Sequence, residues 1–269
     1  MKYDPVKRSL GTVFNTTPFL RKTFYHLLNL LLLRSWHIRK ELRKLRNTLP
    51  EAPSILDAGS GFGQYDYTMS MQFPKAQITA VDVKQEQIDD CNAFFERIGR
   101  SDRVKFEYAD LTTFRQPEAY DLALSVDVME HIEEDVTVFK NLAASLRNGG
   151  VLLISTPSDQ GGSDVHDDHD DSFIEEHVRD GYAIDDIEAK LKTAGFSEVY
   201  SRYSYGTPGK ISWRISMKWP IKIANAGKVL ILLLPFYYLV FYPIAFVLNI
   251  IDVNSRHKTG TGLIVKAIK

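Results

Sequence analysis

A glycine-rich loop follows the first apolar strand pattern in this sequence. Residues 55–65 read Ile-Leu-Asp-Ala-Gly-Ser-Gly-Phe-Gly-Gln-Tyr. Because Gly59, Gly61 and Gly63 carry no side chains, the backbone can turn sharply at the carboxyl end of a strand and point N–H groups at a ligand. The dinucleotide-binding fingerprint is Gly-x-Gly-x-x-Gly, whereas here the third glycine comes one residue early and Asp57 lies two residues before the first. The spacing therefore indicates a loop for a nucleoside cofactor and argues against NAD.

Carboxylates accompany the next strand patterns, which cover residues 77–83, 103–110 and 120–132. Asp82 lies about 20 residues after the glycine loop, where an acidic side chain can accept both ribose hydroxyls. Asp110 ends the second pattern, and the third opens into a polar loop. The alternative is that each aspartate only caps the helix that follows it. The register of these carboxylates with the glycine loop favours a binding site.

Taken together, these residues resemble the class I S-adenosylmethionine-dependent methyltransferases, in particular the branch that contains the ubiquinone-pathway O-methyltransferases. The matching motifs are Asp-x-Gly-x-Gly-x-Gly, Val-Asp, Ala-Asp-Leu and Asp-Leu-x-Leu-Ser-x-x-x-x-Glu-His, and the resemblance extends over residues 51–205 and the last strand. It implies that S-adenosylmethionine is the cofactor and that Gly59, Gly61 and Gly63 hold its methionine and ribose part. Asp57 would fix the loop. The resemblance also implies cofactor contacts from the following strand ends, namely Asp82 at the ribose with its neighbour Val83, Asp110 and Leu111 at the adenine, and Val126 and Asp127 beside the sulfonium.

Two groups of residues provide candidate bases for the acceptor of the methyl group. Glu130 and His131 follow the fourth strand pattern, on the side of the sheet where such folds bind substrates, and a capping and packing role is the alternative. An acidic segment after the fifth strand pattern contains His166, His169 and His177. A histidine has a pKa near neutrality, which suits a base. The sequence does not choose between these histidines.

The acidic segment also raises the question of a metal. His166 and His169 lie three residues apart among carboxylates, and a divalent ion there would acidify a phenol or catechol acceptor. The spacing matches no specific metal motif, so we predict no metal site and expect a solvated acidic lid over the cleft. Cys91 is the single cysteine, which excludes a disulfide framework or a cysteine metal cluster and suits a reducing compartment.

Strand and helix patterns alternate from residue 53 to residue 204, which is typical of a doubly wound α/β fold with a mostly parallel sheet of seven strands. Helix patterns cover residues 64–72, 85–98, 133–147 and 185–194, and the later strand patterns cover residues 151–155, 199–205 and 261–268. We expect a basic helical segment over residues 1–50, the cofactor-binding core over 51–205, a hydrophobic insertion over 206–258 and the last core strand over 259–269.

The N-terminal segment is basic, although the formal net charge of the whole chain is only −1. Residues 1–50 contain eleven Lys or Arg against Asp4 and Glu41. Residues 18–45 read as one or two helices, Leu-rich at first and basic afterwards. Such a segment either packs over the cofactor cleft or contacts an anionic membrane surface. Its apolar stretch is interrupted by Asn29, so we do not expect a secretory signal.

An uncharged run of 23 residues, 229–251, lies in the insertion and is long enough to span a bilayer. A single span is not expected, because the sixth and seventh strands of one sheet must hold both ends of the insertion on the same side. Pro235 and Pro243 also interrupt a straight helix, so we predict a monotopic pair of short helices in one leaflet. The expected interfacial residues are Trp213, Trp219, Tyr237, Tyr238 and Tyr242 with Lys210, Arg214, Lys218, Lys222 and Lys228. The alternatives are a homodimer interface and a core helix pair.

These features predict a methyltransferase on the cytoplasmic face of a membrane, acting on a lipidic small molecule. We expect O-methylation of a prenylated aromatic or phenolic acceptor. The alternatives are N- or C-methylation of a lipid head group or quinone precursor, and a non-catalytic cofactor-binding scaffold. Nucleic acid is not an expected partner, because the basic stretches adjoin Leu-rich segments rather than aromatic stacking platforms.

Overall fold

The structure is a computed structural model that describes residues 17–161 and 178–269. Its centre is a seven-stranded sheet in the order β3-β2-β1-β4-β5-β7-β6. The strands are β1 Ser54–Ala58, β2 Gln77–Asp82, β3 Val104–Tyr108, β4 Tyr120–Val126, β5 Leu146–Pro157, β6 Glu198–Ser204 and β7 Gly262–Ile268. β7 runs antiparallel to its neighbours β5 and β6, and the other neighbouring strands are parallel. The predicted doubly wound, mostly parallel sheet is confirmed.

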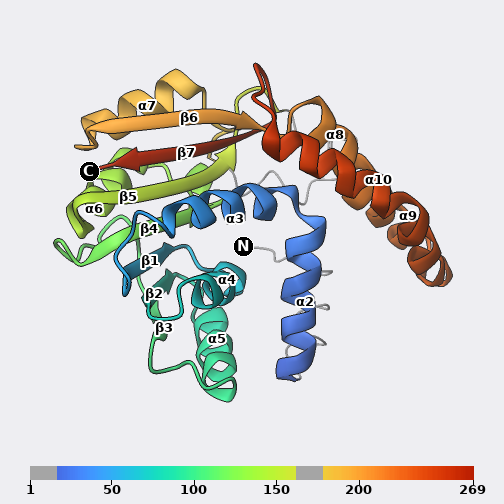
Figure 1. Cartoon of the computed structure of the whole chain (residues 1–269), viewed down its shortest axis with the longest axis horizontal. Coiled ribbons are helices and arrows are strands. Elements are labelled where there is room, and N and C mark those ends of the chain that lie inside the picture. The colour runs from blue at the N-terminus through green and yellow to red at the C-terminus, as the bar shows by residue number, and fades with distance from the viewer. Residues whose placement is uncertain (1–16, 162–177) are drawn as a thin grey trace.

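Helices cover both faces of the sheet (Figure 1). They are α2 Pro18–Leu31, α3 Leu33–Leu45, α4 Gln64–Gln72, α5 Gln85–Arg97, α6 Asp135–Ser145 and α7 Ile184–Thr193. Side chains of α2 to α5 join one buried apolar cluster and side chains of α6 and α7 join another. Consecutive strand residues alternate between the two, since Ile55 packs in the first cluster and Leu56 in the second. Coverage of both faces explains why the central strands are apolar almost throughout.

The N-terminal segment forms two helices rather than one. The Thr17 hydroxyl accepts a hydrogen bond from the Leu20 N–H at 3.2 Å, and Pro18 lies in the first turn of α2, where its missing N–H costs nothing. Leu32 has an extended backbone between α2 and α3. The chain therefore bends at Leu32, and each helix meets a different part of the core.

The insertion between β6 and β7 forms a helical arm, residues 207–254, that projects from the body of the molecule (Figure 1). Its elements are α8 Thr207–Trp213, a π-helical stretch η2 Arg214–Lys218, α9 Trp219–Ala226, a 3₁₀ stretch η3 Lys228–Leu233 and α10 Leu234–Asn254. α10 packs along α8 and returns the chain to the sheet. A Cβ on Gly209 of α8 would lie 2.6 Å from Asp252 Oδ2 of α10, so the glycine permits this close helix crossing.

The internal structure of the arm differs from the prediction. We expected Pro235 and Pro243 to divide the uncharged run into two short helices, but α10 is continuous over 21 residues. Pro235 lies in its first turn, where no N–H bond is lost, and Pro243 is tolerated inside the helix. Two of the expected interfacial tyrosines also have partners within the arm, because Tyr237 and Tyr238 donate to backbone carbonyls of η2 at 2.7 and 2.9 Å.

The arm leaves the sheet at the edge where the glycine loop lies. β6 and β5 are both antiparallel to β7, so β6 runs in the same direction as β5, β4 and β1. The carboxyl end of β6, Ser204, pairs with Gly262 at the start of β7. Both ends of the arm are therefore attached at the carboxyl edge of the parallel strands, which is the edge that binds ligands in open α/β sheets.

Candidate active site

The glycine loop has a backbone that side chains would disturb. Gly59, Gly61 and Gly63 have φ values of 90°, 51° and 74°, in the left-handed region that favours glycine. A Cβ on Gly59 would lie 2.3 Å from Val128 Cγ2, whereas nothing lies within 4 Å of a Cβ on Gly61. The N–H of Gly59 is bonded to the Val81 carbonyl at 2.9 Å, which fixes the loop to the end of β2. The loop thus combines a fixed base with open space at its centre.

Asp82, predicted to bind the ribose, lies beside this loop at the end of β2. Its Oδ2 accepts the Gly61 N–H at 2.9 Å, and its Oδ1 accepts the Lys84 N–H at 3.0 Å. Each carboxylate oxygen has a further lone pair. The structure therefore brings Asp82 and the centre of the loop together, as the strand pattern predicted.

Asp57 and Asp66 form a buried carboxyl pair next to the loop. Their side chains are 1% and 0% exposed. Burial raises the pKa of Asp57 to about 7, and burial and the charge of Asp57 raise the pKa of Asp66 well above its usual range. Asp57 Oδ2 and both Asp66 oxygens meet no N–H or O–H donor among the described residues. We conclude that the two carboxyl groups hold a shared proton.

The other predicted cofactor contacts differ in exposure. Asp110 is exposed and accepts both the N–H and the hydroxyl of Thr112, at 2.8 and 2.7 Å. These bonds lower the pKa of Asp110 and form a local turn, which differs from the helix cap that we weighed as its alternative role. Leu111 is buried, Val83 is exposed, and Val126 is half-buried at the end of β4.

The tip of β4 carries the first group of candidate bases. Asp127 has a left-handed φ of 53°, and its carboxylate forms an ion pair with Arg34 of α3. Glu130 is 1% exposed and accepts a hydrogen bond from the Thr156 hydroxyl at 3.0 Å. Burial raises the pKa of Glu130. His131 lies on the exposed side of the short 3₁₀ helix η1 Met129–His131.

α2 is bonded directly to the glycine loop. Arg21 and Tyr25 are buried, and both donate to the backbone carbonyl of Phe62, the residue between Gly61 and Gly63. These bonds pack α2 against the glycine loop, and both roles weighed for the N-terminal segment stay predictions. The sequence did not identify Arg21 or Tyr25, although a charged residue inside a Leu-rich helix is the signal that was available.

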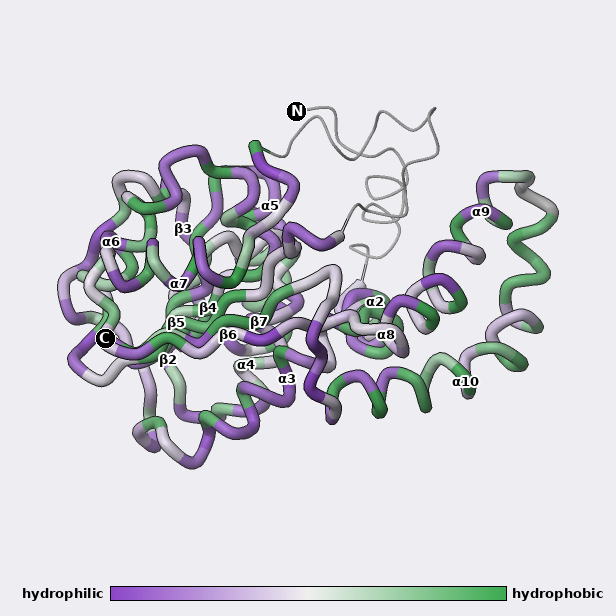
Figure 2. Tube along the Cα trace, turned by 90° about the horizontal axis from the view of Figure 1, so that it is seen from above, coloured by the Kyte–Doolittle hydropathy of each residue, from purple (hydrophilic) through white to green (hydrophobic). Residues whose placement is uncertain are grey.

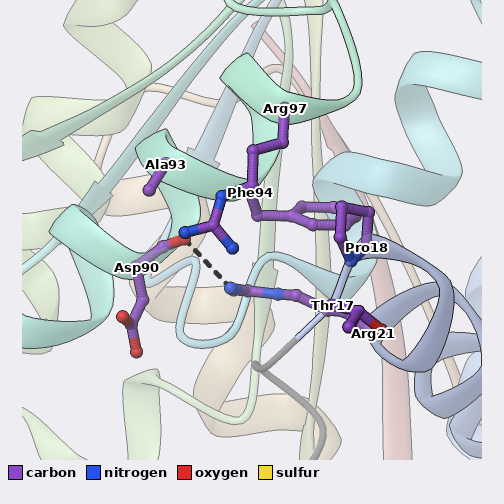
Figure 3. Close-up of a pocket in the computed structure, with 7 residues that line it drawn as sticks. All are labelled: Thr17, Pro18, Arg21, Asp90, Ala93, Phe94 and Arg97. Atoms are coloured by element: carbon purple, nitrogen blue, oxygen red, sulfur yellow. Dashed lines mark hydrogen bonds between the residues drawn. The ribbon is translucent and has the colours of Figure 1, made fainter.

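Arg21 also links α2 to α5. Its guanidinium donates to the Asp90 carbonyl at 3.0 Å, as Figure 3 shows. A small pocket at this contact is lined by Thr17, Pro18, Arg21, Asp90, Ala93, Phe94 and Arg97. None of the predicted cofactor or acceptor residues lines it, so we assign it to the packing of α2 on α5.

The second group of candidate bases, His166, His169 and His177, lies outside the described residues. Within 17–161 and 178–269, no three His, Cys, Asp or Glu side chains gather as metal ligands. The prediction about metal in the acidic segment therefore stays a prediction.

Comparison with known proteins identifies the core. Residues 55–150 match the family model of the methyltransferase domain. Residues 55–150 are therefore similar to a methyltransferase domain. Phosphoethanolamine N-methyltransferase 1 of Arabidopsis thaliana is 31% identical over 171 residues, which cover 60% of this chain and 32% of that protein. Malonyl-[acyl-carrier protein] O-methyltransferase 2 of Ilyobacter polytropus is 26% identical over 106 residues, 39% of this chain and 40% of that protein. The chain spans about a third of the length of the plant relative.

Solved structures share the fold of this methyltransferase domain. Phosphoethanolamine N-methyltransferase 2 of Haemonchus contortus with S-adenosyl-L-methionine has a TM-score of 0.63 at 17% identity, covering 100% of this chain and 60% of that chain. Geranyl diphosphate methyltransferase, also solved with the cofactor, has a TM-score of 0.54 at 10% identity, with coverage of 86% and 82%. Residues 55–150 therefore match a methyltransferase domain, and the two solved structures share its fold and are described with S-adenosylmethionine.

The residues at the loop fit this cofactor. The open space at Gly61 admits a ligand, and the buried oxygens Ser60 Oγ and Ser125 Oγ have no partner among the described residues. Bound S-adenosylmethionine supplies a methyl group on a cationic sulfur, an electrophile that needs positioning more than activation. Gly59, Gly61 and Gly63 with Asp57 and Asp82 would hold it, as the resemblance implied.

Proposed function

We propose that the chain is a membrane-associated N-methyltransferase that acts on the amine of a lipid-borne, phosphoethanolamine-type head group. The plant relative favours nitrogen over oxygen as the acceptor atom, because it is a phosphoethanolamine N-methyltransferase and matches more of this chain, at higher identity, than the O-methyltransferase of Ilyobacter polytropus. This choice replaces our first expectation, O-methylation of a prenylated aromatic, by the head-group alternative weighed beside it. A lipid-borne acceptor gives the apolar arm a role.

The observation that carries this proposal is the position of the arm relative to the glycine loop. Both ends of the arm are attached at the carboxyl edge of the parallel strands, where Asp82 and Asp127 also lie. A bilayer that holds the arm would therefore face the edge at which the methyl group is transferred. An arm attached at the opposite edge would keep the site away from lipid.

The exposed surface of the arm supports a bilayer as its partner. Leu230–Asn254 is 25 residues long and apolar enough to cross a membrane, and only 6% of its most apolar window is buried within the chain. Figure 2 shows hydrophobic residues along most of α10. The large exposed side chains are Leu232, Leu233, Phe236, Leu239, Val240, Ile244 and Val247. Apolar area of this extent is rare on a soluble monomer, and the low burial excludes the core helix pair.

Basic and aromatic residues of the arm are placed as an interfacial helix requires. Lys222 and Trp219 are exposed on α9, and Lys210 lies on α8. Lysines near the surface are attracted to anionic lipid, and tryptophan favours the boundary between head groups and acyl chains. We place α10 deepest and α8 and α9 nearer the head groups.

The residues at the tip of β4 suit an amine acceptor. A protonated amine has no lone pair with which to attack a methyl group, so a base must take up its proton. Asp127, Glu130 and His131 follow β4 at the cofactor edge and are the described candidates for this role. Carboxylates also attract the ammonium form and hold it near the site.

The experiment presents the purified full chain and methyl-labelled S-adenosylmethionine with one acceptor at a time. The acceptors are vesicles with phosphatidylethanolamine, soluble phosphoethanolamine, and vesicles with a prenylated phenol. We expect N-methyl product from phosphatidylethanolamine, identified by mass spectrometry. Label on the phenol oxygen would show the O-methylation that we first expected. If no acceptor is labelled, the alternative of a non-catalytic, cofactor-binding scaffold is supported.

A further inference from the structure

Arg34 is a cation fixed at the cofactor edge by an element outside the sheet. It lies in the first turn of α3, and its backbone N–H donates to the hydroxyl of Tyr205 at 3.0 Å. Tyr205 itself follows β6 with a left-handed φ of 54°. The guanidinium of Arg34 forms an ion pair with Asp127 at the tip of β4. Arg34 thus joins α3, the base of the arm and the catalytic loop.

The Arg34 side chain remains open to a ligand. It is 37% exposed and Asp127 is 29% exposed, so solvent reaches the ion pair. A guanidinium presents several N–H donors in a flat fork, and one carboxylate uses only part of them. The same fork matches the oxygens of a phosphate.

Polar groups surround the Arg34 side chain. Its charge opposes the rise in pKa that burial causes in Tyr65, Tyr205 and Glu130, which places these groups near the guanidinium. The Tyr65 hydroxyl is 3.3 Å from the Ser35 hydroxyl, which also accepts a hydrogen bond from the Gln64 side chain at 2.9 Å. Hydroxyl and guanidinium donors together suit an anion.

Charge balance gives the reason for an anion at this place. The cofactor brings a sulfonium and the acceptor brings an ammonium group, while Arg34 adds a third positive charge at the same edge. A negatively charged group on the acceptor would offset the charge of Arg34 and leave the Asp127 carboxylate to face the acceptor's cation. A neutral phenol would supply no such compensation.

We propose that Arg34 binds the phosphate of the acceptor, and that this phosphate replaces Asp127 as the partner of the guanidinium. The inference rests on the proposed function for the identity of the acceptor. It makes Arg34 a specificity-determining residue for phosphorylated amines, and it makes the Arg34–Asp127 ion pair the resting state of the site.

The first test measures the binding of phosphoethanolamine and of ethanolamine to the full chain by calorimetry. We expect Arg34→Gln to weaken phosphoethanolamine binding about 10- to 100-fold, the usual effect of losing charged hydrogen bonds, and not to weaken ethanolamine binding. Arg34→Lys should restore part of the affinity. The matched control is Arg147→Gln, which breaks another Arg–Asp ion pair, with Asp121, at the opposite edge of the sheet.

The second test separates ligand binding from a purely structural ion pair. Asp127→Asn removes the competitor for Arg34, so inorganic phosphate should bind this variant several-fold more tightly than the wild type. If the ion pair only stabilised the fold, Arg34→Gln and Asp127→Asn would change phosphate affinity in the same direction. Thermal melting of each variant shows whether it is folded.

The outcomes distinguish this inference from the proposed function. If no amine is methylated but phosphate affinity falls in Arg34→Gln and rises in Asp127→Asn, the proposed function fails and the anion site stands. If phosphatidylethanolamine is methylated with the same KM by wild type and Arg34→Gln, the anion site is wrong and the function stands. A wild-type protein that binds neither phosphoethanolamine nor inorganic phosphate would also overturn the anion site.

Discussion

The buried carboxyl pair Asp57–Asp66 stands out among the residues of the site because burial normally excludes two acids side by side. Neither side chain has an N–H donor on its facing oxygens within the described residues. The fold tolerates the pair because the pair holds a proton, which removes the repulsion between two negative charges. Since Asp57 leads into the glycine loop, the protonation of the pair bears on the stability of the whole loop.

This pair predicts how stability depends on pH. The pKa of Asp57 in the fold is about 7, above the value of about 4 for an aspartate in the unfolded chain. The folded protein therefore binds more protons than the unfolded chain between these values. The contribution of Asp57 to stability should be fully present below about pH 4 and should be lost as the pH rises from about 4 through about 7.

Asp66→Asn should remove most of this slope and raise the melting temperature at pH 8, because the amide cannot ionise. Urea unfolding at several pH values measures the effect, with the exposed Asp102→Asn as control. A variant with the same pH slope as the wild type would show that the pair does not share a proton.

Asp82 gives a prediction for cofactor binding. Asp82→Ala should weaken S-adenosylmethionine binding by about 1.5–3 kcal/mol, the usual contribution of hydrogen bonds to a charged group. Asp82→Asn should weaken it less, because an amide oxygen still accepts from the Gly61 N–H. Calorimetry measures both variants. Unchanged affinity in Asp82→Ala would mean that the ribose is bound elsewhere.

At the scale of elements, a fully buried carboxylate joins the arm to the core. Asp252 near the end of α10 is fully buried and accepts hydrogen bonds from His37 of α3 at 2.9 Å and from the Gly209 N–H of α8 at 3.0 Å. It also accepts the Tyr205 N–H at 3.2 Å. α3, α8 and α10 therefore meet on a single side chain.

Asp252→Ala should destabilise the protein by about 3 kcal/mol, because it leaves buried donors without an acceptor. Urea unfolding measures the loss, and hydrogen exchange should show weaker protection in α8 and α10 than in the sheet. Ile251→Ala, one residue earlier on the same helix and 45% exposed, is the control. Equal effects of the two substitutions would contradict the anchoring role of Asp252.

The elements themselves were predictable from the sequence because their patterns are local. α4 covers the predicted residues 64–72, and the strands differ from their patterns mainly at the ends. The prediction for α10 was wrong because we expected a proline to end a helix, whereas α10 continues through Pro243. Contacts between elements carry no local pattern, so the ion pair of Arg34 with Asp127 and the bonds of Arg21 to the loop emerged only from the fold.

At the scale of the whole molecule, both ends of the arm are attached at the same edge of the sheet. We therefore predict that the chain binds to a membrane without spanning it. The chain should float with vesicles that contain anionic lipid. Tags placed at Met1 and after Lys269 should both report the cytoplasmic side in protease-protection experiments on cells. Tags on opposite sides of the membrane would contradict the monotopic arrangement.

The central claim is that the arm brings the methyltransferase edge to a bilayer-borne acceptor. The most direct measurement compares methylation of phosphatidylethanolamine in vesicles with methylation of soluble phosphoethanolamine, in the wild type and in a variant with Leu232, Leu233 and Phe236 changed to Ser. These side chains are 72%, 54% and 70% exposed, so the change should spare the fold. A variant with the exposed Met71, Tyr108 and Tyr200 changed to Ser is the matched control.

We predict that the arm variant methylates phosphatidylethanolamine in vesicles at least about tenfold more slowly than the wild type. The reason is that each buried apolar side chain contributes ~1.5–3 kcal/mol to membrane binding. Its cofactor affinity and its activity on soluble phosphoethanolamine should stay at the wild-type level, and the control variant should behave as the wild type. Equal vesicle activity in the arm variant and the wild type would contradict the account.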